Sequence, residues 1–83
     1  MTISVERAAM KGRLAEAEHN LATLRLRIEG LCTSIRQSLN TALTPVEDLE
    51  IPQVAGQMDL LEDAWAQYQK TRIDIERLKK ELA

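Results

Sequence analysis

A carboxylate and an imidazole stand one helical turn apart near the start of this 83-residue sequence. In di-iron helical bundles, two Glu-x-x-His pairs act together with two further carboxylates, and Glu16 and His19 form one such pair. Both residues, however, are predicted to point away from the apolar seam of their helix. The pattern also arises readily by chance in helices of this composition. We therefore interpret His19 as a solvated side chain and predict no metal site and no cofactor.

The single cysteine, Cys32, is the second residue whose chemistry needs an explanation. A nucleophilic cysteine requires a base nearby, but the only histidine lies 13 positions away, roughly 20 Å along one helix. We interpret Cys32 as a small apolar side chain beside the seam. The sequence also contains no Ser/His/Asp arrangement, no CxxC motif and no phosphate-binding glycine loop, so we predict that the protein is not an enzyme.

Charge is unevenly distributed, although the formal net charge is only −2. Residues 44–63 carry six acids and no base, whereas residues 1–43 and 64–83 each have a net charge of +2. The acidic run is a solvated face or a contact for a basic partner. If the two chain ends meet, their bases form a basic tip that could contact phosphates, although glutamates are interspersed and no aromatic side chain is near. The basic tip comprises Arg7, Lys11, Arg13, Arg77, Lys79 and Lys80.

Apolar periodicity predicts the elements that position these groups. In the first half of the chain, apolar residues recur at alternating spacings of four and three. This unbroken heptad seam is typical of a helix packed lengthwise on another helix. It predicts a first helix from about residue 4 to about 42, with Thr2 or Ser4 capping its first turn. The seam consists of Met10, Leu14, Ala17, Leu21, Leu24, Ile28, Leu31 and Ile35.

The stretch LTPVEDLEIPQVAG interrupts this pattern. Thr44-Pro45-Val46-Glu47 has the form of a capping box, which predicts a short turn that Thr44 caps. Pro52 suits the first position of a second helix over residues 52–82. The apolar positions of this helix are less regular and favour a straight helix over a tight coiled coil. They are Val54, Met58, Leu61, Trp65, Tyr68, Ile75, Leu78 and Leu82.

Two long helices joined by an elbow at about residues 43–52 predict an all-α fold. We expect one domain over residues 1–83, an antiparallel helical hairpin. A chain of this size buries a modest core and usually needs a further source of stability, such as disulfides, a metal or self-association. Because no disulfide framework is present, we expect self-association to supply this stability. The expected assembly is an antiparallel homodimer, a four-helix bundle or coiled coil in which each acidic elbow meets the other copy's basic tip.

Two sets of residues are candidates for the interface. Small residues on the first helix recur opposite the seam, which indicates either close approach of another helix or a tolerated, exposed small-residue face. On the second helix, Trp65 and Tyr68 are predicted to belong to the core next to the elbow. The alternative is a partly exposed aromatic anchor for a partner. The set on the first helix comprises Gly12, Ala15, Ala22, Leu26 and Gly30.

The segments LRLRIEGLCTSIRQSLN, PVEDL and IERLKKEL resemble parts of small proteins encoded by Mu-like transposable phages and prophages. The resemblance extends over residues 24–82. It implies a bacterial cytoplasm and a phage accessory role, and it carries over no catalytic or binding residue. A lone cysteine and the lack of a signal peptide or a long apolar run also favour a cytoplasmic protein without a membrane span.

These observations together predict a non-enzymatic protein–protein interaction or assembly module. The alternative is a small nucleic-acid-associated factor that uses the basic tip. Binding to nucleic acid should weaken steeply with salt, whereas an apolar helix-packing interface should not.

Overall fold

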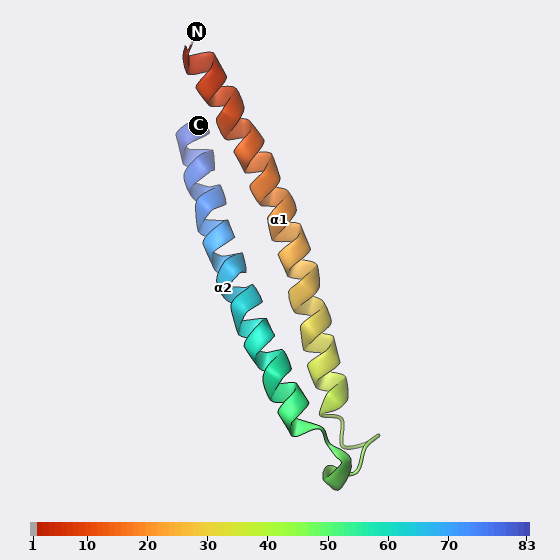
Figure 1. Ribbon diagram of the computed structural model, residues 1–83. Helices are drawn as coiled ribbons and strands as arrows, with labels where there is room; N and C mark the ends of the chain where they lie inside the picture. The colour runs from red at the N-terminus through yellow and green to blue at the C-terminus, as the bar shows by residue number, and fades with distance from the viewer. Residues whose placement is uncertain (1) are drawn as a thin grey trace.

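The protein is a hairpin of two long helices, seen here in a computed structural model that describes residues 2–83, with the side chains of residues 5–83. Helix α1 (Thr2–Ser38) and helix α2 (Ile51–Leu82) are joined by an elbow that contains one 3-10 turn, η1 (Val46–Asp48). The two helices lie side by side and run in opposite directions (Figure 1). The predicted all-α helical hairpin is thereby confirmed.

The hairpin is a narrow rod. Its Cα trace extends 67 × 16 × 15 Å. The N- and C-terminal ends lie together at one end of the rod, and the elbow forms the other end (Figure 1). All contact between distant parts of the chain is therefore spread along one line between α1 and α2.

The predicted seam of α1 is confirmed. Every seam residue from Met10 to Leu31 is half-buried, and Ile35 is buried. Between residues 10 and 35 the other positions are exposed to solvent, apart from Cys32 and Ser34. Since α2 is the only described element beside α1, the heptad pattern identifies the stripe of α1 that packs on it.

Helix α2 has a seam that is as regular as that of α1, so the prediction of an irregular stripe was wrong. Nine buried or half-buried positions follow one another at alternating spacings of three and four. The pattern was hidden because Gln57, Ala64 and Thr71 occupy seam positions although they are not large apolar residues. Met58 and Trp65 each lie one position beyond the seam and are exposed. The seam of α2 is Val54, Gln57, Leu61, Ala64, Tyr68, Thr71, Ile75, Leu78 and Leu82.

The first helix ends at Ser38, four residues earlier than predicted. Asn40 explains the difference. Its side-chain Oδ1 accepts a hydrogen bond of 3.0 Å from the Ala42 N–H, and its carbonyl accepts bonds from the N–H groups of Leu43 and Thr44. Asparagine side chains compete with helical backbone bonding in this way and favour turns. The predicted cap by Thr2 or Ser4 lies outside the side chains that the structure describes.

The start of α2 and the turn before it also differ from the prediction. The short turn exists as η1, but its first bond runs from the Asp48 N–H to the Pro45 carbonyl. Pro45 therefore takes the N-cap position, no side chain caps the turn, and the predicted cap by Thr44 is wrong. Helix α2 begins at Ile51, with Pro52 within its first two positions. Proline fits there because the first helical N–H groups have no partner inside the helix.

More surface stays exposed than in a compact protein of the same mass. The accessible area is 6428 Å², whereas a folded monomer of 9.4 kDa exposes about 5,000 Å², an excess of about 1,400 Å². The buried residues are Ile35, Val54, Ala64, Ile75 and Leu78. Two helices alone cannot enclose their apolar side chains. Apolar surface that a further layer of structure would cover therefore stays exposed to solvent.

The seam assignment predicts unequal effects of one substitution at two isoleucines. Ile35 is 8% exposed on the seam, and Ile73 is 65% exposed on the outer side of α2. Ile35→Ala should lower the free energy of unfolding by about 2–5 kcal/mol, as is typical of large-to-small core changes. The matched control Ile73→Ala should change it by less than about 0.5 kcal/mol. Urea unfolding at one fixed protein concentration measures both, and equal effects would contradict the seam.

The elbow predicts a second contrast. Asn40→Ala removes the acceptor of the Ala42 N–H and should cost about 0.5–1.5 kcal/mol, the usual contribution of one such hydrogen bond. Thr44→Ala removes no side-chain cap and should change stability by less than about 0.5 kcal/mol. Thermal unfolding followed by circular dichroism would show the reverse order if Thr44 were the cap.

Candidate functional site

The two sides of the hairpin differ in chemistry. We call one side the groove face; it carries Cys32 on α1 and Met58 and Trp65 on α2. The opposite side, the polar face, has two shallow hollows. They are lined mainly by polar and charged side chains: Asn20, Thr23, Gln67, Lys70 and Asp74 in one, and Arg13, Glu16, Asn20, Asp74 and Arg77 in the other. The hollows of the groove face therefore have a more apolar lining than those of the polar face.

The part of the groove face nearer the elbow is almost wholly apolar. This elbow groove has a volume of about 270 Å³. Trp65 lines it and is 57% exposed. Glu62 is the one charged residue at its edge, and the remaining lining comes from Ile28, Cys32, Met58 and Leu61. Water therefore contacts a continuous apolar surface that neither helix covers.

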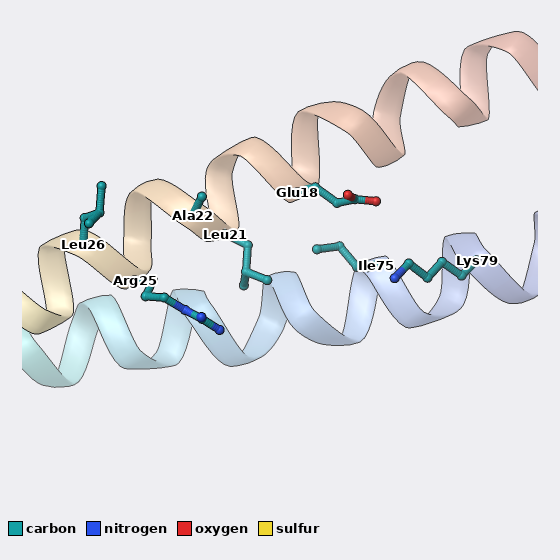
Figure 2. A pocket seen from close by; sticks show the side chains of 7 residues that line it. All are labelled: Glu18, Leu21, Ala22, Arg25, Leu26, Ile75 and Lys79. Atoms are coloured by element: carbon teal, nitrogen blue, oxygen red, sulfur yellow. The ribbon is translucent and has the colours of Figure 1, made fainter.

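A second hollow, the tip groove, lies on the same face nearer the chain ends and has a volume of about 490 Å³. Leu21 points from α1 towards α2, and Ile75 points back towards α1 (Figure 2). Ala22 presents only a methyl group, and Leu26 points away from α2 (Figure 2). Leu26 is 70% exposed. Charged residues frame the hollow: Glu18, Arg25 and Lys79.

One polar contact lies between the two grooves. The Arg25 guanidinium donates a hydrogen bond of 3.0 Å to the Tyr68 hydroxyl. This bond, together with the Tyr68 charge interaction, raises the pKa of Arg25 above its ordinary value. Like other arginines, Arg25 is positively charged at physiological pH. The two grooves are separate hollows, and Arg25 supplies a cation on the side of the tip groove nearer the elbow groove.

The structure changes the interpretation of the two aromatic residues. Tyr68 is half-buried on the α2 seam. Trp65 does not belong to the core, contrary to the prediction, because the small Ala64, 1% exposed, takes the seam position beside it. Size misled the prediction, since a tryptophan among apolar residues suggests burial. The heptad register, continued through Gln57 and Thr71, would have placed Trp65 at the edge.

The small residues of α1 are brought to the surface, not to the contact with α2. Gly12, Ala15 and Gly30 are exposed. A Cβ at either glycine would meet nothing within 4 Å, so packing inside the hairpin does not require glycine there. Ala22 and Leu26 differ from the others because both line the tip groove. Close approach of another chain to the glycines stays a prediction.

The six bases of the predicted basic tip are exposed at the end where the termini meet. Several of them, however, lie close to acids or donate to a backbone carbonyl. Arg7 donates a hydrogen bond of 2.7 Å to the Leu82 carbonyl, a favourable place for a cation at the end of α2. Arg77 approaches the Asp74 carboxylate to 3.7 Å, and Arg13 lines the same hollow as Glu16. Lys79 faces the tip groove. The tip therefore mixes both signs of charge.

The acidic run of residues 44–63 is a solvated surface. All six of its carboxylates are exposed. The two ion pairs of the described residues lie elsewhere, at Arg72–Glu76 and Arg77–Asp74. The elbow end of the rod is thus acidic, although Arg36 lies in the last turn of α1.

The residues considered for metal or nucleophilic chemistry are not brought together. His19 is exposed, Glu16 lies at the edge of the polar face, and Cys32 is half-buried in the elbow groove. Among the described residues, no three His, Cys, Asp or Glu side chains form a group that could hold a metal ion. Neither helix, as far as the chain is described, has an apolar stretch long enough to cross a membrane.

Comparisons with protein-family models, with curated proteins and with solved structures found no match to this chain. The groove face therefore has to be interpreted from its own chemistry. It offers an almost wholly apolar elbow groove, a tip groove framed by charged residues, and an exposed tryptophan. Apolar and aromatic side chains of this kind are enriched at the centre of protein interfaces.

The position of Tyr68 predicts which part of this side chain stabilises the hairpin. Tyr68→Phe keeps the half-buried ring and removes only a surface hydrogen bond, so the midpoint of thermal unfolding should change little. Tyr68→Ala also removes the ring and should cost about 1–2 kcal/mol, less than a fully buried aromatic does. For a chain of this size, that lowers the midpoint by roughly 5–15 °C. Equal losses in both variants would show that the bond to Arg25 dominates.

Proposed function

We propose that the protein is a non-enzymatic interaction and assembly module, and that it self-associates by packing its groove face on the groove face of a second copy. Two hairpins joined in this way form a four-helix bundle. The observation that carries the proposal is the uncovered apolar surface of the groove face, with Trp65 at 57% exposure. Large exposed apolar patches often mark interaction sites in monomeric proteins.

The accessible area is large enough for one interface of standard size. A standard interface removes about 800 Å² from each partner. That would leave the hairpin with roughly 5,600 Å² of its 6428 Å², closer to the value for a compact protein of its mass. Burial of apolar area contributes about 25 cal/mol per Å² and would supply the driving force.

Charge supports one orientation. The elbow end carries six exposed carboxylates, and the opposite end carries an excess of bases. Packed head to head, two hairpins would bring the acidic elbows together. Packed antiparallel, each elbow lies near the other copy's chain ends. Each surface charge contributes only about 0–1 kcal/mol, so charge selects the orientation and does not drive association.

A biological setting is suggested by the resemblance of residues 24–82 to small proteins of Mu-like phages. It supports a phage or prophage accessory role in a bacterial cytoplasm, and it stays a prediction about origin. No particular observation favours nucleic-acid binding, because the bases of the tip are interspersed with acids.

The assembly predicts a dimer that resists salt. Sedimentation equilibrium at low micromolar protein should give twice the chain mass at both low and high NaCl, because apolar burial is not screened by ions. A monomer at micromolar concentration under both conditions would refute self-association. Dissociation at high salt alone would show that charge, not apolar burial, drives association.

The orientation predicts distances between labels. In a Cys32→Ala background, spin labels at Lys80 of both copies should lie about 36 Å apart along the rod, because Lys80 is 12 residues, about 18 Å, from the middle of the α2 seam at Tyr68. A label at Lys80 on one copy and at Asp59 on the other should lie much closer. Two nearby Lys80 labels would refute the antiparallel arrangement while leaving the bundle intact.

A further inference from the structure

Resting on the self-association proposed above, we propose that Trp65 of each copy inserts into the tip groove of the other copy. The site it enters is lined by Leu21, Ala22 and Ile75. Each dimer would then contain two identical contacts related by a two-fold axis, as an isologous interface requires.

The register follows from the position of Tyr68. It is the fifth of the nine seam positions of α2, so it lies at the middle of the seam. Arg25, whose side chain is bonded to it, lies near that level on α1. Along its helix, Trp65 is three residues towards the elbow, about 4.5 Å, and Ala22 is three residues from Arg25 towards the chain ends, also about 4.5 Å. A two-fold axis through the middle of the seam therefore brings Trp65 to about the same level along the rod as Ala22 and the tip groove of the second copy.

Side-chain direction brings the indole further into the tip groove. Long helical side chains lean towards the N-terminus of their helix. For Trp65 this direction is towards its own elbow, which in an antiparallel dimer is towards the chain ends of the other copy. The indole is therefore directed from Ala22 towards the hollow beside Leu21 and Ile75, which the small Ala22 side chain leaves open.

The chemistry of the groove suits a tryptophan. Leu21 and Ile75 supply apolar walls, and Arg25 supplies a cation at the edge of the hollow. A guanidinium over an indole face is a favourable cation–π contact. Tryptophan is also enriched among the few interface residues that carry most of the binding energy. The contact would cover the most exposed aromatic surface of the hairpin and an unfilled hollow in one step.

The chain contains one tryptophan, so its fluorescence reports this contact directly. On dilution, the emission should move to longer wavelength over the same concentration range in which sedimentation shows the dimer dissociating. A dimer whose tryptophan emits like the solvent-exposed residue of the monomer would overturn the inference and leave self-association standing.

Substitution gives a second test with a matched control. Trp65→Ala should raise the dimer dissociation constant at least tenfold, whereas Ile73→Ala, which removes a similarly exposed apolar side chain from the outer side of α2, should change it less than twofold. Both residues are exposed in the hairpin, so circular dichroism should show unchanged helix content. Equal, small effects of both substitutions would overturn the inference.

Mixing two variants identifies the occupant of the groove. Ala22→Glu should also prevent dimerisation, because it places a carboxylate in the apolar hollow. In a mixture of the two variants, Ala22→Glu chains still carry Trp65, and Trp65→Ala chains still carry an unaltered tip groove. A heterodimer of the two therefore contains one intact contact. Sedimentation should therefore show heterodimers at concentrations where each variant alone is monomeric. Absence of heterodimers at every concentration at which the unmodified chain is dimeric would overturn the inference.

Discussion

Everything in this structure depends on the packing of one seam of α1 against one seam of α2. A helix in a two-helix hairpin has a neighbour on one side only, so most seam residues of α1 remain half-buried. The dry, fully enclosed core that stabilises larger domains needs further layers. The hairpin therefore depends on regular repetition along its 67 Å length, where many modest contacts replace a few deeply buried ones.

Sequence patterns predicted this architecture where large side chains mark the seam. On α1, each seam position between Met10 and Ile35 is apolar, and the periodicity identified the packed stripe. On α2, the same heptad runs through Gln57, Ala64 and Thr71. Position in the heptad, not hydrophobicity, decides what faces α1, and Ala64 becomes the most buried of the core residues at 1% exposure. A search for large apolar residues missed this seam because an alanine or a threonine fills it equally well.

The errors around Trp65 and the elbow have distinct physical causes. Trp65 was predicted in the core from its size, yet Met58 and Trp65 sit at equivalent edge positions seven residues apart and both remain exposed. The end of α1 depends on the hydrogen bond of the Asn40 side chain to the Ala42 N–H, a choice between competing local bonds that periodicity does not describe. The candidate site was therefore less predictable than the fold, because the residues of the groove face can be identified only from the heptad registers of both helices.

The asymmetry between the two faces would also limit the size of the proposed assembly. Apolar hollows occupy the groove face, whereas the polar face carries residues such as Arg13, Asn20 and Asp74. A surface with apolar patches on both sides would let hairpins stack without end, as heterologous contacts that do not close lead to filaments. With apolar grooves on one face only, the second copy of the proposed pair would cover the grooves of the first and present its polar face outwards. The same feature that leaves the single hairpin incomplete thus favours a closed pair.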